Sequence, residues 1–153
     1  MMSLELFLPL VFRAKLLICP QCVVSNPVDH TQWINRHKPS LLQATPTQLS
    51  IIAKHINPNS NMRILVGGEQ LNITIAKQLL AITQEVYNVY GPSETTIWST
   101  FKKIEDCTNL SIGKPISDTI CCVVDSNMEI LPPYVTGELI IGGMGVFITS
   151  KLN

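Results

Sequence analysis

The most informative segment of this 153-residue chain is Val86-Tyr87-Asn88-Val89-Tyr90-Gly91-Pro92-Ser93-Glu94-Thr95-Thr96-Ile97-Trp98. Its first five residues are typical of a strand. A turn then follows, because proline fixes its own φ and glycine tolerates positive φ. Past the turn come four side chains that carry oxygen, Ser93 to Thr96. Since hydroxyl and carboxylate oxygens suit phosphate or Mg²⁺, the segment predicts a strand that ends in a polar ligand-binding turn.

Strands and helices alternate between residues 40 and 90, which predicts a parallel α/β sheet. Strands are expected over residues 40–44, 63–66 and 86–90. A helix to about His55 is expected after Thr45-Pro46-Thr47-Gln48, because these residues can form a capping box with proline at the first helical position. A second helix is expected over residues 72–83. Its inner face is formed by Ile75, Ala76, Leu79 and Leu80.

The two ends of the chain complete the predicted fold. Near the start we expect a buried helix over residues 3–12, a short buried strand over 16–19 and a helix over 27–37. After Trp98 the pattern becomes β-rich, with short runs at 120–125 and 138–141 that predict an antiparallel section added to the sheet. The expected class is therefore α/β, with a partial parallel sheet and flanking helices over residues 1–90 and a β-rich section over 98–146.

Composition excludes several kinds of protein. The chain is 46% hydrophobic and only 14% charged, which suits a buried sheet and a surface that is partly covered by other structure. The net charge is zero and no basic block occurs, so neither nucleic acid nor an anionic membrane is an expected partner. No segment is long enough to span a bilayer or has the order of a signal peptide, so we expect a cytoplasmic protein. No sequence feature indicates an oligomer.

Five cysteines occur, without the spacing of a disulfide framework. Cys19-Pro20-Gln21-Cys22 invites a redox or zinc interpretation. Zinc would need a second pair, and His30 and His37 lack finger spacing. A thioredoxin-like site would open a helix, whereas residues 23–27 are expected to continue as strand or loop. Reduced strand-end cysteines are therefore expected, and a thiol or metal protein built on Cys19 and Cys22 remains a weaker alternative.

Residues 88–96, Asn-Val-Tyr-Gly-Pro-Ser-Glu-Thr-Thr, resemble the Asn-x-Tyr-Gly-Pro-Thr/Ser-Glu motif of adenylate-forming enzymes. The version is that of adenylation domains in nonribosomal peptide synthetases. Other segments that resemble the family are residues 4–10, 42–47, 64–71, 111–116 and 136–146. The resemblance covers nearly the whole chain but only the middle portion of the family's domain. Residues 1–153 are thus expected to be a fragment of the large N-terminal subdomain, without the C-terminal lid subdomain.

The resemblance implies ATP and Mg²⁺ as cofactors. The family makes an aminoacyl-AMP from an amino acid or another carboxylic acid and transfers it to the phosphopantetheine thiol of a carrier domain. It implies that Glu94 is a ligand of Mg²⁺ and that Ser93 and Thr95 contact phosphate. The residues implied for the adenine side are Tyr90, which would stack on the base, with Gly68, Glu69, Asn88 and Gly91. The residues implied for the acyl pocket are Leu4, Gln43, Leu65, Gly67, Val89, Ile97 and Trp98.

That pocket is almost entirely apolar, so we expect an acid with an apolar or aromatic side chain. The family's phosphate loop, its ribose-binding aspartate and the lysine of its mobile subdomain do not occur in these 153 residues. We therefore expect this polypeptide alone not to form adenylates. The alternative function is a nucleotide-binding remnant without catalysis, which would keep Gly68, Tyr90 and Glu94.

Overall fold

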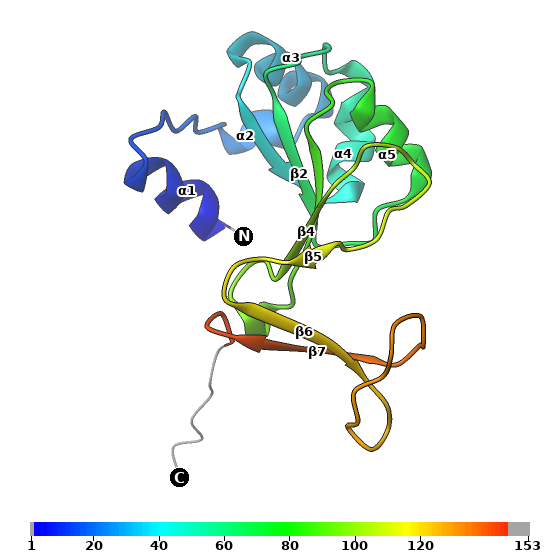
Figure 1. Ribbon diagram of the computed structural model, residues 1–153. Helices are drawn as coiled ribbons and strands as arrows, with labels where there is room; N and C mark the ends of the chain where they lie inside the picture. Colours follow the sequence, from blue (N-terminus) through cyan, green and yellow to red (C-terminus); the bar gives the residue numbers. More distant parts are fainter. Residues whose placement is uncertain (1, 147–153) are drawn as a thin grey trace.

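The computed structural model describes residues 2–146, with side chains from residue 5 onward. The helices are α1 (Met2–Val11), α2 (Gln21–Val24), α3 (Pro27–His37), α4 (Pro46–Ile52) and α5 (Ile73–Leu80), and the 3₁₀ helices are η1 (Ala53–His55) and η2 (Ser93–Thr95). The strands are β1 (Leu41–Ala44), β2 (Arg63–Gly67), β3 (Val86–Tyr90), β4 (Thr100–Lys103), β5 (Lys114–Pro115), β6 (Thr119–Val124) and β7 (Glu138–Gly143). Figure 1 shows their arrangement.

The central sheet confirms the predicted α/β class. Its strands follow the order β1-β2-β3-β4-β5, with β1, β2 and β3 parallel and β4 and β5 antiparallel to their neighbours. The register places Gln43 opposite Leu65 and Gly67 opposite Val89. Because side chains alternate along a strand, these four residues share one face of the sheet.

The other face of the sheet carries the hydrophobic core. Ile64, Val66 and Val86 are fully buried there, together with Leu49 of α4 and Leu79 of α5. Figure 1 shows α3, α4 and α5 on this side of the sheet and α1 on the opposite side. The sheet therefore has one helix-covered face and one largely open face.

Side-chain caps mark the starts of two helices on the covered face. The predicted capping box at Thr45 is confirmed: Gln48 N–H donates to Thr45 Oγ1 at 3.3 Å, and Thr45 N–H donates to Gln48 Oε1 at 3.2 Å. Asn72 caps α5 by accepting a hydrogen bond from Ile75 N–H at 2.9 Å. Among the described residues, no helix is long and apolar enough to cross a membrane.

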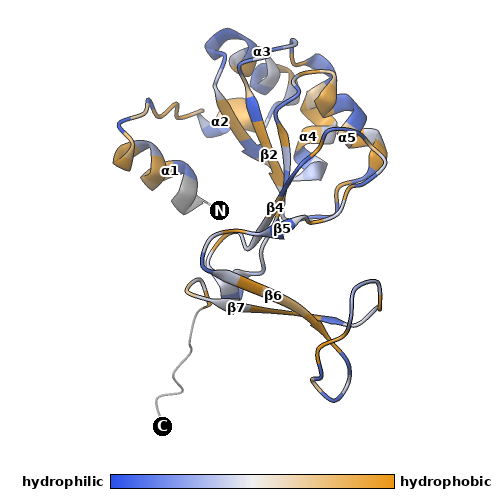
Figure 2. Ribbon diagram, viewed as in Figure 1, coloured by the Kyte–Doolittle hydropathy of each residue, from blue (hydrophilic) through white to orange (hydrophobic). Residues whose placement is uncertain are grey.

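Two expectations for the first twenty residues were wrong in part. The helix near the start is present as α1, but it is not buried: Phe7 is 60% exposed and Val11 is 75% exposed. Residues 16–19 form no strand, and Ile18 is 78% exposed. An apolar run favours burial, but burial also requires a neighbouring surface. Figure 2 shows α1 as an apolar helix beside the sheet rather than within its core.

The strands predicted at 120–125 and 138–141 are present as β6 and β7, but they do not extend the central sheet. They form a two-stranded sheet, paired from Thr119 opposite Gly143 to Val124 opposite Glu138, and Val124 also forms an isolated bridge with Ile130. The strands added to the sheet are β4 and β5 instead. The reason is that β4 follows the turn directly and takes the free edge of β3, with Lys103 opposite Tyr87. In Figure 1 the β6–β7 hairpin projects from the end of the sheet.

Candidate functional site

The polar turn lies at the carboxyl end of β3, where open α/β sheets bind ligands. Ser99 N–H donates to the carbonyl oxygen of Tyr90 at 2.7 Å and closes the turn into a loop. A Cβ at Gly91 would overlap the Ile97 carbonyl and lie 2.8 Å from Trp98 Cα. Glycine is required there for this close approach. The predicted turn is present, but Gly91 does not use the tolerance of glycine for positive φ, because only Gly68, Gly113 and Gly143 among the described glycines have a positive φ.

The four oxygen-bearing side chains of the turn divide into two kinds. Ser93 and Glu94 are exposed, and no ion pair within residues 2–146 involves Glu94. Thr95 is only 7% exposed; its hydroxyl donates to the Pro92 carbonyl at 3.0 Å and lies 2.5 Å from Ser99 Oγ. The phosphate contact expected of Thr95 stays a prediction, since its hydroxyl has internal partners here.

Thr96 has a backbone conformation that β-branched residues rarely adopt. Its φ is +76° and its ψ is −71°, and Ile97 N–H donates to the Thr95 carbonyl at 3.1 Å, which defines a γ-turn. Such a conformation costs about 1–3 kcal/mol. The Thr96 hydroxyl donates to the Gly145 carbonyl at 2.7 Å. The turn is therefore strained and is held from outside by a residue just past β7.

The residues expected near adenine differ in their exposure and in their hydrogen-bond partners. Gly68, at φ +85°, and Tyr90, whose side chain is 38% exposed, lie at the ends of the adjacent strands β2 and β3. Asn88 is buried, and its amide donates to the carbonyls of Leu110 and Ser111 at 3.2 and 3.1 Å. Asn88 thus anchors the loop that precedes β5, and its nearness to adenine stays a prediction.

Glu69 is exposed and bonded to the start of α4. Its carboxylate accepts hydrogen bonds from Thr47 Oγ1 at 2.5 Å and from Thr47 N–H at 3.0 Å. These bonds, the hydroxyl first, hold the pKa of Glu69 below its ordinary value. The carboxylate consequently stays ionised and ties the turn after β2 to α4.

Most of the expected acyl-pocket residues meet on the open face of the sheet. Gln43, Leu65, Gly67 and Val89 come from β1, β2 and β3, and Trp98 returns to them from the turn. A Cβ at Gly67 would lie 2.7 Å from Val89 Cγ2 and 2.8 Å from Trp98 Cη2. The missing side chain of Gly67 therefore makes room for the indole.

The remaining two expected pocket residues are less well defined. Ile97 is half-buried beside Trp98. Leu4 belongs to α1, and its side chain lies outside the described residues.

Sequence reasoning missed a chain of hydrogen bonds in this pocket. Trp98 Nε1–H donates to Gln43 Oε1 at 3.2 Å, and Gln43 Nε2–H donates to Glu5 Oε1 at 3.1 Å. Glu5 is the one charged residue of the otherwise apolar α1, and that isolation was the available signal. As a result, the Gln43 carbonyl and the indole N–H are already paired.

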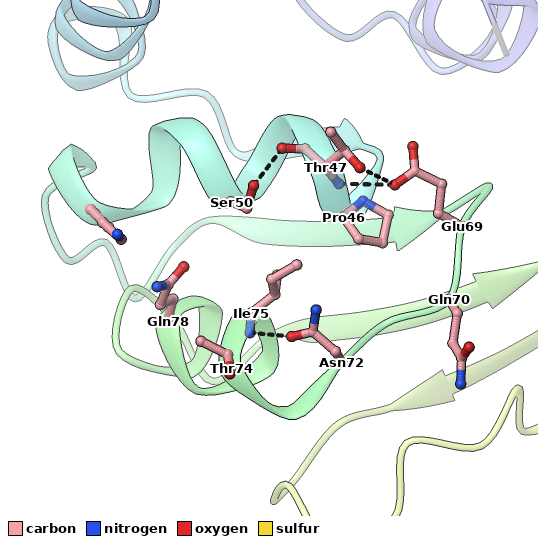
Figure 3. Close-up of a pocket in the computed structure, with 10 residues that line it drawn as sticks. Pro46, Thr47, Ser50, Glu69, Gln70, Asn72, Thr74, Ile75 and Gln78 are labelled. Atoms are coloured by element: carbon pink, nitrogen blue, oxygen red, sulfur yellow. Dashed lines mark hydrogen bonds between the residues drawn. The ribbon is translucent and has the colours of Figure 1, made fainter.

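A separate cleft of about 580 Å³ lies between α4 and α5 (Figure 3). Thr47 and Ser50 line it from α4, Thr74 and Gln78 line it from α5, and Glu69 reaches across to Thr47. Of the residues expected to bind ligand, only Glu69 lines this cleft. The cleft is thus distinct from the pocket on the open face of the sheet.

The cysteines do not form a metal site in the described part of the chain. Cys22 lies in α2, so the expectation of strand or loop over residues 23–27 was wrong in part: α2 extends to Val24 and Pro27 opens α3, which leaves only Ser25 and Asn26 outside the helices. Both Cys19 and Cys22 are free thiols, and burial raises the pKa of Cys19. A raised pKa disfavours the reactive thiolate. Within residues 2–146, no group of three or more His, Cys, Asp or Glu side chains is placed so that it could hold a metal ion.

Residues 1–149 match the AMP-binding enzyme family. The chain therefore belongs to the AMP-binding enzyme family. This confirms the resemblance indicated by the motif around Tyr90.

Individual relatives point to nonribosomal peptide synthetases. The chain is 36% identical over 147 residues to the dimodular nonribosomal peptide synthase of Bacillus subtilis (strain 168), a match that covers 94% of this chain and 6% of that protein. It is 31% identical over 143 residues to the delta-poly-L-ornithine synthetase of Acinetobacter baumannii (strain AB307-0294), covering 93% of this chain and 10% of that protein. The chain thus spans a tenth or less of these two relatives.

Solved structures agree with this assignment. The crystal structure of holo-AB3403, a four-domain nonribosomal peptide synthetase bound to AMP and glycine, superposes with a TM-score of 0.89 at 35% identity and covers 94% of this chain and 11% of that chain. The anthranilate CoA ligase AuaEII in complex with anthranoyl-AMP shares the fold, with a TM-score of 0.72 at 18% identity. That match covers 87% of this chain and 27% of the ligase.

Proposed function

We propose that this chain supplies the nucleotide- and acid-binding portion of an adenylation domain, which activates an amino acid or another carboxylic acid with ATP. In that reaction a carboxylate oxygen bonds to the α-phosphorus, the bond from that phosphorus to the bridging oxygen breaks, and pyrophosphate leaves. The phosphopantetheine thiol of a carrier domain then bonds to the acyl carbon, the bond from that carbon to the phosphate oxygen breaks, and AMP leaves. The observation that carries the proposal is one turn that presents Ser93 and Glu94 to solvent and returns Trp98 to the open face of the sheet, where its indole N–H donates to Gln43.

The nucleotide would bind across the ends of β2 and β3. Tyr90 would stack on adenine, with Gly68 and Gly91 allowing a close approach and with Glu69 and Asn88 near the edge of the base. Ser93, together with Thr95 if its hydroxyl leaves Ser99, would contact phosphate. Glu94 fits a magnesium ligand because its carboxylate is exposed and joins no ion pair within the described residues. When bound, Mg²⁺ would supply positive charge beside the phosphates.

The acid would place its side chain on the open face of the sheet. Leu4, Leu65, Gly67, Val89, Ile97 and the Trp98 ring are apolar. Gln43 is already bonded to Trp98 and Glu5. A negatively charged side chain would lose its water without gaining a partner, at a cost of several kcal/mol, and a positively charged one would meet Glu5, whose Oε1 already accepts a hydrogen bond from Gln43. We therefore propose an acid with an apolar or aromatic side chain.

The 153-residue polypeptide is proposed to be inactive when tested alone. Its sequence contains no Ser/Thr/Gly-rich phosphate loop with a lysine. Because losing one preorganised charge-stabilising group costs about 10²–10³ in rate, the absence of several would abolish turnover. ATP–pyrophosphate exchange by the purified polypeptide with any acid would contradict this proposal.

Isothermal titration with ATP, in the presence and absence of Mg²⁺, tests the nucleotide site. We expect wild-type binding to strengthen with Mg²⁺, and Glu94→Gln to lose that gain while binding of AMP without Mg²⁺ stays unchanged. Glu129→Gln removes an exposed carboxylate far from the turn in sequence and serves as the matched control. An unchanged Mg²⁺ dependence in Glu94→Gln would contradict the assigned role.

A second candidate is nucleotide binding without catalysis. It is favoured by the exposure of Tyr90, whose ring is available at the strand end in this chain. To separate the two, residues 1–149 can replace the matching segment of the Bacillus subtilis relative. Restored pyrophosphate exchange supports the adenylating function, whereas binding without exchange in that stable hybrid supports the second candidate.

A further inference from the structure

Thr96 has an unfavourable backbone conformation and a hydrogen bond to a residue distant in the sequence. Its φ of +76° is unfavourable for a β-branched residue, and its hydroxyl donates to the Gly145 carbonyl, 49 residues away, at 2.7 Å. A residue held in such a conformation persists only where its surroundings over-determine it. The bond to Gly145 is one such constraint.

The reversal at Thr96 sets the direction of the side chains before and after it. Before it, Ser93 and Glu94 are exposed at the end of the sheet. After it, Ile97 N–H bonds back to Thr95, and Trp98 reaches Gln43 on the open face. If φ of Thr96 relaxed to a favourable value, the side chains of Glu94 and Trp98 would change their positions relative to each other.

The residue that Thr96 bonds to, Gly145, lies just past a strand of the second, two-stranded sheet. Gly145 follows β7, and a Cβ at Gly145 would lie 3.2 Å from the Thr95 carbonyl, so the β7 end packs closely against the turn. That end is itself fixed, because Met144 N–H donates to the backbone carbonyl of Asp118 at 3.0 Å and Val146 N–H donates to the backbone carbonyl of Gly143 at 3.2 Å. The β6–β7 hairpin therefore presents a carbonyl to the turn at a defined place.

We propose that Thr96 is a positioning residue, and that its bond to Gly145 holds Glu94 and Trp98 in the fixed relation needed to bind both halves of one acyl-adenylate. This inference rests on the proposed function, in which Glu94 serves the phosphate side and Trp98 serves the acyl side. It predicts that the Thr96 hydroxyl affects binding of the joined ligand more than binding of either half alone.

The positional part of the inference is tested without ligand. Trp98 is labelled with 5-fluorotryptophan in a Trp33→Phe background, and its ¹⁹F resonance is compared in three variants. Thr96→Val, which keeps the shape but lacks the hydroxyl, is expected to shift or broaden the Trp98 signal, whereas Thr96→Ser restores it. Thr74→Val, an exposed threonine on α5, is the matched control. An unchanged Trp98 signal in Thr96→Val, at unchanged thermal midpoint, would overturn the inference.

The binding part uses a non-hydrolysable apolar acyl-sulfamoyl adenosine, with AMP as the half-ligand. Thr96→Val is expected to weaken binding of the joined mimic at least tenfold and of AMP less than threefold, and Thr96→Ser to return both to near wild type. Equal losses for mimic and AMP would reduce Thr96 to a structural role and overturn the inference. If the wild type binds no mimic, the proposed function fails, and the ¹⁹F result alone decides whether Thr96 positions Trp98.

Discussion

The indole N–H of Trp98 donates a hydrogen bond to Gln43 Oε1 at 3.2 Å and so joins the end of the polar turn to β1, 55 residues earlier. Glu5 accepts the other end of the Gln43 amide at 3.1 Å. These bonds orient the amide and give its oxygen and its nitrogen one partner each. The first prediction concerns their removal.

Gln43→Leu should destabilise the chain by about 1 kcal/mol, because the half-buried indole N–H and the Glu5 carboxylate each lose a partner. Urea unfolding measures the change in free energy. Gln84→Leu, which removes only an exposed side-chain bond to Leu80, is the control and should change stability by less than about 0.5 kcal/mol. Equal changes in the free energy of unfolding for the two substitutions would mean that the Trp98–Gln43 bond stabilises the chain no more than an exposed side-chain bond does.

Gly67→Ala should fill the pocket. The added methyl would overlap the Val89 carbonyl oxygen and lie 2.7 Å from Val89 Cγ2 and 2.8 Å from Trp98 Cη2, so the backbone of β3 and the indole must both move. Overpacking of this kind typically costs about 1–3 kcal/mol. We expect that loss of stability in urea unfolding, together with weaker binding of aromatic acyl-adenylate mimics.

Gly142→Ala is the control for Gly67→Ala, because a Cβ at Gly142 has no neighbour within 4 Å. Its unfolding free energy and its ligand binding should match the wild type. If Gly67→Ala binds aromatic mimics as well as Gly142→Ala does, Gly67 does not bound the acyl pocket.

Thr47→Val should raise the pKa of Glu69 toward the ordinary glutamate value of about 4.3. The Thr47 hydroxyl is the largest cause of the lowered pKa, and its backbone N–H is the next. Because the folded pKa lies below the unfolded one, Glu69 contributes stability above the unfolded pKa, and this is lost as pH falls through the folded pKa. A carboxyl NMR titration reports the shift directly, with Thr74→Val as control; an unchanged titration in Thr47→Val would contradict the assignment.

Thr45→Ala should weaken α4, because it removes the acceptor for Gln48 N–H in the capping box. The typical cost of losing such a cap is about 1 kcal/mol. Thermal or urea unfolding measures it. Thr45→Ser, which keeps the hydroxyl, should retain most of the stability, and failure of serine to do so would argue against the capping role.

Features controlled by nearby residues could be predicted from the sequence. The parallel strands follow from their apolar runs, and the start of α4 follows from the cap Thr45, which acts over three residues. These inferences needed only local conformation. The family resemblance, rather than strand alternation, predicted that Gln43, Gly67 and Val89 belong to one pocket, and the strand register places them on one face of the sheet.

Features controlled by distant residues could not be predicted from the sequence. The exposure of α1 depends on which surfaces surround it, and the separation of β6 and β7 depends on β4 having taken the edge of β3. The bonds from Gln43 to Glu5 and from Thr96 to Gly145 span 38 and 49 residues. No periodicity or cap encodes such pairs, since they arise only when the elements meet.

The most direct test of the proposed nucleotide and acid site is a ¹H–¹⁵N NMR titration of the polypeptide with an apolar acyl-sulfamoyl adenosine in the presence of Mg²⁺. Saturable shifts should concentrate at Gly68, Tyr90, Ser93, Glu94 and the Trp98 indole, with little change at Ser50 and Gln78 in the cleft between α4 and α5. Shifts confined to that cleft, or no saturable shift at the turn, would contradict the proposal.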